Sequence, residues 1–364
     1  TNCKSPRSMR PGSRECQMKI NDKVSIGEGA ASFVIAEIGS NHGQDFQLAL
    51  DTIDAAVEAG ADAVKFQSLA VNELYLEPSA EIQKLHQAID LDESWHQPLK
   101  EHCDKRGIIF FSTPTYLKSV DLLSDLSVDL FKLASAQIGT FPQLIERVAQ
   151  TGKPTLLSTG LVSYSELEQV IKIFERNGNK NYCILHCNSI YPTPADRVFL
   201  GRMEIYRKMF GCPVGFSDHT DGIAVATAAV ALGADVIEKH FILKRGVVNA
   251  PDEPFSLEPA ELQAMIQSIR TVEAASSTDV RIEIEPEESR FKESIRYRAI
   301  LARNRMAGDS IRDGDIRYLR HPKGIDAVQM MTLLSQDCIT ARALPAGHLL
   351  ERSDISIASV GQNS

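Results

Sequence analysis

Two short runs late in the chain end in histidine and have the residue types of a metal site. The first is Gly215-Phe-Ser-Asp-His219 and the second is Val236-Ile-Glu-Lys-His240. An alanine-rich helical pattern lies between these apolar runs, which is typical of a βαβ unit with two parallel neighbouring strands. Their carboxyl ends then meet, so His219 and His240 lie side by side, as a divalent metal requires. The alternative is that each histidine merely ends a strand.

Strand alternation separates the polar residues of the second run. Successive side chains of a strand point to opposite faces of the sheet. Glu238 is therefore predicted to face the same way as His240, whereas Lys239 is predicted to be buried on the opposite face or under a helix.

Eight apolar, β-rich runs recur along the chain, and a helical pattern follows each of them. Near-continuous apolar strands covered by helices are typical of a parallel sheet, and eight such units make a (β/α)8 barrel. A doubly wound sheet is the alternative, but the chain has no G-x-G-x-x-G turn. We therefore predict an α/β fold of the TIM-barrel type. The predicted strands are 33–38, 63–67, 108–113, 130–135, 154–159, 182–187, 213–217 and 236–241, and the predicted helices are 46–59, 93–106, 117–126, 141–149, 164–176, 204–210, 222–232 and 259–274.

Composition and charge narrow the function classes. The chain has a formal net charge of −9, although residues 1–17 hold four basic residues against one acid. An acidic body disfavours a nucleic-acid or anionic-membrane surface. No run approaches the ~18 apolar residues of a transmembrane helix. The five cysteines after residue 17 include no CxxC pair, which is typical of a reduced, cytoplasmic protein.

The two ends of the chain differ from its middle in amino-acid composition. Residues 1–17 are rich in Ser, Pro and Arg and lack the apolar core of a signal peptide, so we interpret them as an expression leader. The barrel is predicted over 18–275. The polar run 276–294 is predicted to be a linker, and 295–364 a separate small domain.

The predicted small domain contains an internal repeat. Residues 300–316 align without gaps with 339–355 in the frame I-x-A-R-x-x-x-A-G-x-x-[IL]-x-x-x-D-I. Each copy is predicted to form a strand, a turn at Ala-Gly and a short helical turn before Asp-Ile. Two copies favour a pseudo-symmetric β domain.

The active site of a barrel lies at the carboxyl ends of its strands, where this chain has many polar residues. Lys65 and Lys132 are the most informative, because an ammonium within an apolar strand is costly to bury unless an anion meets it. Two such lysines with nearby hydroxyls predict a cradle for a phosphate or a small polyanion. A structural ion pair with a buried carboxylate is the alternative for each lysine. The hydroxyls are those of Thr113, Ser135, Ser158 and Ser217.

The loop after the first predicted strand, Gly39-Ser-Asn-His-Gly43, is short and polar. Glu37, at the end of that strand, is expected to face the metal as a general base or as a residue that orients a ligand. Helix capping or an ordinary salt bridge is the alternative for Glu37. His42 is interpreted as a loop histidine rather than a metal ligand.

Eight motifs in one order along the chain resemble those of the sialic-acid synthases. The resemblance covers nearly everything after Met18, and the tail resembles the antifreeze-like (SAF) domain of those enzymes. It implies a TIM barrel followed by a small, β-rich SAF domain. The motifs are FVIAEIGSNH (33–42), AGADAVKFQ (59–67), FSTP (111–114), FKLAS (131–135), LSTG (157–160), HC and YP (186–192), GFSDH (215–219) and IEKHF (237–241).

This resemblance implies a condensation of phosphoenolpyruvate with an N-acylated amino-hexose, namely N-acetylmannosamine or a diacetamido-trideoxy-hexose. The product is a nine-carbon 2-keto acid, and phosphate is released. His219 and His240 would hold Mn²⁺ or Mg²⁺, which polarises the open-chain aldehyde of the sugar, and Glu37 would handle the proton. The positions that match phosphoenolpyruvate contacts are Lys65, Lys132, Thr113, Ser135, Ser158, Ser189 (where some members have Asn) and Ser217. Gln67, Tyr191 and Asp252 match sugar contacts.

The resemblance also assigns a role to the tail. Arg320 matches an arginine that reaches into the barrel of the partner subunit, which implies a domain-swapped homodimer. A solvated surface arginine is the alternative. The loop 249–258 does not identify the sugar.

Two other functions stay open on the sequence alone. One is a different phosphoenolpyruvate-dependent synthase with a shorter aldose acceptor, but such enzymes do not generally carry the repeat-bearing tail. The other is a non-catalytic carbohydrate-binding or ice-binding protein with an inactive barrel. The second is disfavoured because the full set of Glu37, Lys65, Lys132, His219 and His240 is intact.

Overall fold

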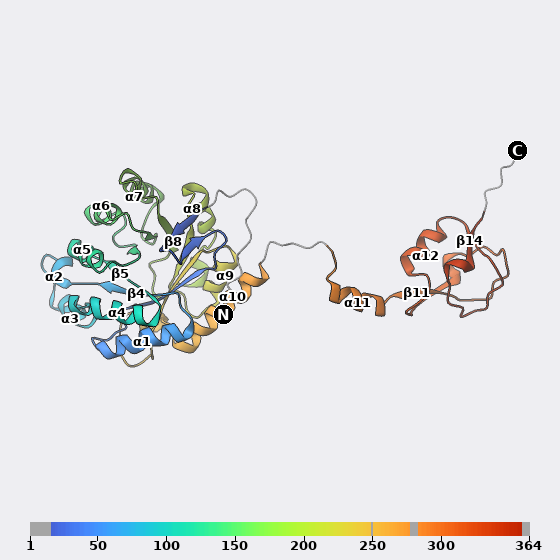
Figure 1. Cartoon of the computed structure of the whole chain (residues 1–364), viewed down its shortest axis with the longest axis horizontal. Helices are drawn as coiled ribbons and strands as arrows, with labels where there is room; N and C mark the ends of the chain where they lie inside the picture. The colour runs from blue at the N-terminus through green and yellow to red at the C-terminus, as the bar shows by residue number, and fades with distance from the viewer. Residues whose placement is uncertain (1–15, 249, 277–282, 359–364) are drawn as a thin grey trace. The chain divides into compact units, whose positions relative to one another are not determined.

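The structure, a computed structural model, describes residues 16–248, 250–276 and 283–358 (Figure 1). The chain divides into two compact units, Thr1–Asp279 and Val280–Ser364. Among the described residues, no helix has the length and apolar character needed to cross a bilayer.

All eight predicted strands are present, and they form one parallel sheet with helices around it (Figure 1). Ladder pairing runs in the order β5-β4-β3-β10-β9-β8-β7-β6, and the two end strands β5 and β6 also contact each other. The predicted (β/α)8 TIM barrel is confirmed. The strands are β3 (Phe33–Gly39), β4 (Ala63–Ser68), β5 (Ile109–Pro114), β6 (Phe131–Leu133), β7 (Thr155–Ser158), β8 (Tyr182–Cys187), β9 (Val214–Asp218) and β10 (Val236–His240).

The predicted helices are also observed, with ends that differ by at most a few residues. Many have a clear start signal: Asp45 and Ser163 accept hydrogen bonds from the first turns of α1 and α7, as N-cap residues do. The helices are α1 (Phe46–Ala59), α4 (His96–Arg106, preceded by the 3-10 turn η1, Glu93–Trp95), α5 (Leu117–Asp125), α6 (Pro142–Gln150), α7 (Tyr164–Arg176), α8 (Arg202–Phe210), α9 (Ala224–Ala231) and α10 (Pro259–Ala275), with 3-10 turns η2 (Ala195–Arg197) and η3 (Glu253–Phe255).

Two helices and one hairpin were not predicted. Helices α2 (Val71–Leu74) and α3 (Ala80–Ile89) lie in the long segment after β4, and strands β1 (Gln17–Lys19) and β2 (Ser25–Gly27) form a hairpin before the barrel. The hairpin includes Gln17, so regular structure begins within the predicted leader 1–17. Most of that leader, residues 1–15, lies outside the described residues.

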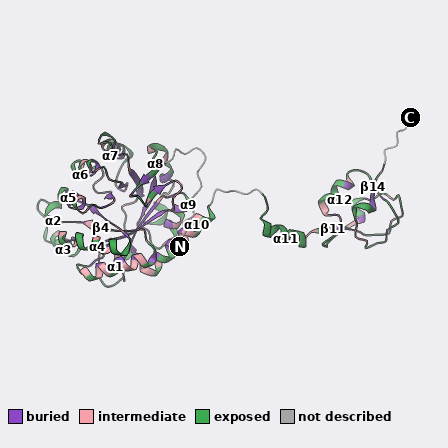
Figure 2. Cartoon of the chain, in the orientation of Figure 1, coloured by how far each residue is buried: buried purple, intermediate pink, exposed green. Residues whose placement is uncertain are grey.

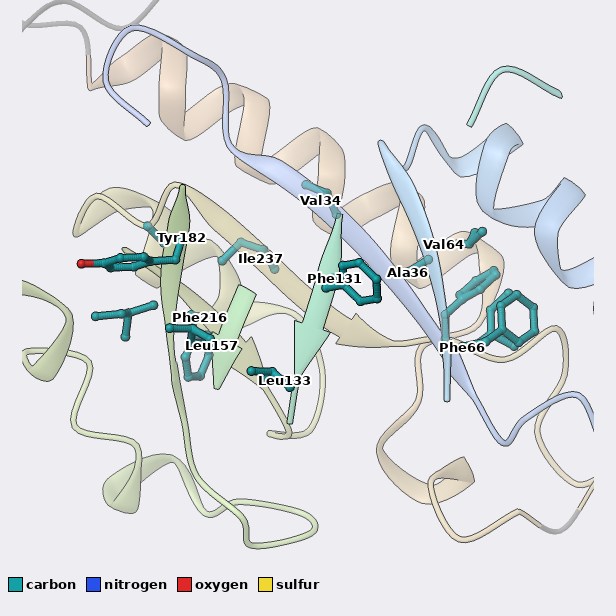
Figure 3. Close-up of a cluster of buried hydrophobic side chains, with 14 of the residues drawn as sticks. Val34, Ala36, Val64, Phe66, Phe131, Leu133, Leu157, Tyr182, Phe216 and Ile237 are labelled. Carbon is teal, nitrogen blue, oxygen red and sulfur yellow. The ribbon is translucent and has the colours of Figure 1, made fainter. Parts of the chain in front are cut away.

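The barrel has two apolar layers. The outer layer lies between the strands and the helices, and Figure 3 shows strand residues such as Val34, Phe66 and Phe216 in it. The inner layer fills the amino-terminal part of the barrel, where Met18 and Ile26 of the hairpin join the interior side chains. Each large apolar side chain buried in this way stabilises the fold by about 1.5–3 kcal/mol. The strands accordingly appear as the buried centre of the unit (Figure 2).

The second unit is built from the two copies of the repeat. Each copy contains an antiparallel strand pair with a 3-10 turn directly before its second strand. The predicted linker 276–294 overlaps helix α11, which starts at a proline, a residue suited to the first helical position. The elements are α11 (Pro286–Ser294), β11 (Tyr297–Leu301), η4 (Asp313–Asp315), β12 (Ile316–Arg320), α12 (Ala327–Leu334), β13 (Cys338–Thr340), η5 (Arg352–Asp354) and β14 (Ile355–Ile357).

The two copies are related by pseudo-symmetry. Arg305 and Leu344, which occupy equivalent positions in the repeat, exchange backbone hydrogen bonds of 2.9 and 2.8 Å. Equivalent ion pairs recur as well: Arg303 contacts Asp315 at 2.9 Å, and Arg342 contacts Asp354 at 2.8 Å. The repeat thus has the structure that its sequence indicates, whereas its likeness to the antifreeze domain stays a prediction.

Candidate active site

The interior of the barrel changes from apolar to polar toward the carboxyl ends of the strands. Ile35, Phe111 and Leu156 belong to the inner apolar layer. Two residues farther along each strand, and therefore on the same face, the side chain is polar or a thiol. This ring takes one buried residue from each strand: Glu37, Lys65, Thr113, Lys132, Ser158, Cys187, Ser217 and Glu238.

The two strand lysines meet around one carboxylate. Lys132 Nζ donates to both carboxylate oxygens of Glu238, at 2.6 and 2.7 Å. Lys65 Nζ lies 3.0 Å from Glu37 Oε1, 3.1 Å from Thr113 Oγ1 and 3.7 Å from Glu238 Oε2. The structure therefore brings both lysines to one place, and it also contains the buried ion pairs that were the alternative.

Burial and charge act in opposite directions on this cluster. Burial lowers the pKa of Lys132, and the neighbouring Lys65 ammonium lowers it further, against the attraction of Glu238. For Lys65, burial is outweighed by the carboxylates of Glu238 and Glu37, so its pKa is raised. Burial raises the pKa of Glu37. An incoming polyanion would compete with Glu238 for two ammonium groups that are already desolvated.

The two strand-end histidines lie side by side beside this cluster. Their ring centroids are 5.3 Å apart. Burial lowers the pKa of His219 to about 4 and the pKa of His240 well below its usual value, so both rings are neutral near pH 7. Neutral imidazole is the form that binds metals.

The donor set fits a divalent cation. His240 Nδ1 and Glu37 Oε2 are buried and have no hydrogen-bond partner among the described residues. Among the described residues, no group of three His, Cys, Asp or Glu side chains is arranged to hold a metal. The donors that lie together are the two imidazoles, and the buried Glu37 is paired with His240 across the strands. A metal held by so few protein ligands keeps coordination positions open for water and substrate, as is typical of catalytic metal sites.

The hydroxyl residues surround a glycine after β7. A Cβ added at Gly160 would overlap the Ser189 hydroxyl and lie 2.8 Å from Ser135 Oγ. Ser158 Oγ is buried without a hydrogen-bond partner among the described residues, and Ser217 Oγ donates to Glu238 at 2.8 Å. These hydroxyls line the same end of the barrel as the lysines.

The Gly160→Ala variant tests this cradle. Its added methyl group displaces the hydroxyls of Ser135 and Ser189, so we expect the KM for the anionic substrate to rise by about 10-fold or more, in line with about 1.5–3 kcal/mol for a hydrogen bond to a charged group. Gly201→Ala is the matched control, because a Cβ there meets nothing within 4 Å. Steady-state kinetics on both variants measure the effect. Equal KM values for the two variants would contradict the placement of the cradle.

The residues expected to contact the sugar lie nearer the mouth of the barrel. Gln67 Nε2 donates to Glu37 Oε1 at 2.7 Å, and Asp252 Oδ2 lies 3.4 Å from His240 Nδ1. Burial raises the pKa of Asp252 to about 7, and Glu37 adds to the shift. The half-exposed ring of Tyr191 lies 4.5 Å from the His219 ring. Asp252 and Tyr191 therefore border the histidine pair, and Gln67 contacts Glu37.

Comparison with known proteins identifies the family. A family model described as the NeuB family matches residues 52–281. The chain belongs to the NeuB family. The N,N'-diacetyllegionaminic acid synthase of Campylobacter jejuni is 35% identical over 84% of this chain and 95% of its own length. Human N-acetylneuraminate-9-phosphate synthase is 34% identical over 69% of this chain and 72% of its own.

A solved structure of the same kind supports the fold. The N-acetylneuraminic acid synthetase of Leptospira borgpetersenii has a TM-score of 0.71 and 31% identity, covering 78% of this chain and 98% of that one. The fold of this NeuB chain thus matches that of a solved synthetase.

Two residues of the candidate site were not among the predicted site residues. Glu238 was recognised as facing His240, but its two lysine partners come from other strands, which alternation does not reveal. Phe255, in η3, packs its ring 4.9 Å from the His240 ring. No local pattern pointed to Phe255, because its loop has no regular periodicity.

Arg320, a predicted site residue, belongs to the second unit, and His42, which was not predicted as a site residue, follows β3. Arg320 is exposed on β12 of the second unit, with its Cζ 5.5 Å from the centre of the Tyr297 ring. Its link to a barrel stays a prediction. His42 is buried, contacts Trp95 edge to face, and accepts a hydrogen bond from the backbone of Gln44. The structure thus supports the interpretation of His42 as a loop histidine.

Proposed function

We propose that this protein condenses phosphoenolpyruvate with an N-acylated amino-hexose to form a nine-carbon 2-keto acid and phosphate. The observation that carries the proposal is the contact of two buried strand lysines with one carboxylate, beside a pair of neutral histidines. The first is a site for a small polyanion and the second a site for a divalent cation. The names of the family relatives agree with this chemistry.

Phosphoenolpyruvate would bind in the lysine and hydroxyl cradle. Lys65 and Lys132 supply charge-assisted hydrogen bonds to its phosphate and carboxylate, and Glu238 gives up part of its contact with them. The water-poor interior strengthens these interactions relative to solution. The hydroxyls proposed to complete the cradle are those of Thr113, Ser135, Ser158, Ser189 and Ser217.

The sugar would bind at the mouth, where Gln67, Tyr191 and Asp252 lie. His219 and His240 would hold Mn²⁺ or Mg²⁺, which supplies Lewis-acid polarisation of the sugar aldehyde when bound. Carbon 3 of phosphoenolpyruvate forms a bond to the aldehyde carbon as the double bond between carbons 2 and 3 opens, and the aldehyde oxygen takes up a proton. Water adds at carbon 2 and loses a proton. The bond from carbon 2 to the phosphate oxygen then breaks, and the hydroxyl on carbon 2 becomes the keto group as its proton leaves with the phosphate. Glu37, whose pKa is raised by burial, is placed to accept the proton of the water.

The second unit enters this proposal through Arg320. We propose that it contacts the sugar in the barrel of a partner subunit, within a domain-swapped homodimer. Its exposure on β12 leaves the guanidinium available for such a contact.

The free thiols of the six described cysteines support a reducing, cytoplasmic setting.

The test is phosphate release from phosphoenolpyruvate with Mn²⁺ and a panel of acceptors. The panel holds N-acetylmannosamine, its 6-phosphate and the diacetamido-trideoxy-hexoses. Release that requires one acceptor and stops with EDTA is expected, and it would identify the sugar. No release with any acceptor, from folded protein that binds Mn²⁺, would overturn the proposal.

A further inference from the structure

A second buried ion pair lies next to the histidines but on the opposite face of the sheet. Lys239 Nζ is 3.0 Å from Asp218 Oδ2, and both side chains have no exposed area. Their strand neighbours Ile237 and Phe216, two residues earlier, belong to the outer apolar layer. The pair therefore lies between the sheet and its helices, as predicted for Lys239, and does not face the polar ring.

The ion pair stands where the strand pairing ends. The β9–β10 register runs from Ile237 opposite Phe216 to Lys239 opposite Asp218. His219 follows the last paired residue of β9. His240 is still paired, but with Glu37 of β3. Pairing with β3 therefore holds His240, whereas the β9–β10 ladder ends before His219. The backbone bond of His219 goes to a loop instead, since its carbonyl oxygen accepts a hydrogen bond from Thr193 N–H at 2.9 Å.

The ion pair also secures the chain on the far side of His219. Asp218 Oδ1 accepts a hydrogen bond from the Thr220 N–H at 2.8 Å, and Lys239 Nζ donates to the Thr220 carbonyl oxygen. Both backbone groups of Thr220 are thus tied to the two residues that directly precede the histidines. His219 is held between Asp218 and Thr220.

A stability argument alone does not explain these charges. Desolvation of a buried ion pair offsets much of its attraction, and apolar replacements are often equally stable. Directional hydrogen bonds, in contrast, fix geometry, and groups behind metal ligands commonly tune metal affinity in this way.

We propose that the Asp218–Lys239 pair is a positioning device that sets the separation of His219 and His240 for the metal. The inference rests on the proposed metal-binding function of the two histidines. Neither Asp218 nor Lys239 touches the substrate cradle. Their effect reaches the site only through the backbone on either side of the histidines.

The double variant Asp218→Asn/Lys239→Met of the full-length chain tests the proposal. It removes both charges together, so no unpaired ion is left buried, and the new side-chain amide keeps an oxygen for the Thr220 N–H. We expect Mn²⁺ binding, measured from free Mn²⁺ by electron paramagnetic resonance, to weaken roughly 10- to 100-fold. Activity should recover at high Mn²⁺, with the KM for phosphoenolpyruvate near that of the unaltered protein.

A matched control exists at the other end of the same strands. Arg207 contacts Asp235 at 2.8 Å, and Asp235 accepts a hydrogen bond from the Val214 N–H at the start of β9. The variant Arg207→Met/Asp235→Asn removes this pair in the same manner. It should lower the melting temperature without changing Mn²⁺ affinity.

The outcomes separate the two proposals. A folded Asp218→Asn/Lys239→Met variant with unchanged Mn²⁺ affinity would overturn the positioning role. If that variant does not fold, the single variant Asp218→Asn decides: Mn²⁺ binding weakened by more than about twofold supports the role, and a smaller change refutes it. Failure of the unaltered protein to bind Mn²⁺ would overturn the metal function and, with it, this inference.

Discussion

Replacing His240 with alanine is expected to reduce phosphate release by more than about 1,000-fold, which corresponds to roughly 4 kcal/mol of transition-state stabilisation. The loss follows because one of only two imidazoles in the donor set disappears, together with the polarisation that a bound cation supplies. His219→Ala should have the same effect. Removal of metal from the unaltered protein with EDTA should cause the same loss of phosphate release. Added Mn²⁺ should restore the activity of the EDTA-treated protein but not that of the alanine variants.

His186→Gln is the control for these variants. His186 is also a buried strand histidine, but it faces outward on β8, and its Nε2 lies 2.6 Å from the Val198 carbonyl oxygen. The change should cost stability and leave turnover per folded molecule close to normal. The assignment of the metal site would be wrong if His240→Ala kept more than about a tenth of the activity, a loss of less than 1.4 kcal/mol.

Replacing Lys132 with methionine is expected to impair both stability and substrate binding. Among the described residues, the change leaves the buried Glu238 with Lys65, 3.7 Å away, as its cationic partner. Breaking a buried ion pair typically costs about 3–5 kcal/mol. Urea unfolding should show this loss, and the KM for phosphoenolpyruvate should rise by about 100-fold, since a charge-assisted hydrogen bond contributes 1.5–3 kcal/mol.

The double variant Lys132→Met/Glu238→Gln separates the two effects. It removes the uncompensated carboxylate, so most of the lost stability should return. Substrate affinity should stay low, because the cradle still lacks one ammonium group. Recovery of normal affinity for phosphoenolpyruvate in this variant would show that Lys132 serves only as the partner of Glu238.

The amino-acid sequence by itself determined the barrel and which polar residues gather at one end of it. The reason is that both depend on local periodicity. Near-continuous apolar runs followed by helical patterns specify parallel strands, and alternation along each strand specifies which side chains face inward. Lys65, Lys132 and His240 could therefore be placed at one end of the barrel before any contact was known. The repeat in the tail was also recognised from the sequence alone, because residues 300–316 align without gaps with 339–355.

The tertiary structure decided which inward-facing groups meet. Glu238 is 106 residues from Lys132 along the chain, and their contact depends on how the barrel closes. Alternation says that a side chain faces inward, but not which side chain it meets across the interior. Alternation likewise does not reveal that Asp252 lies beside His240, or that Met18 of the hairpin joins the inner apolar layer of the barrel. These contacts join segments far apart in sequence, so only the folded chain reveals them.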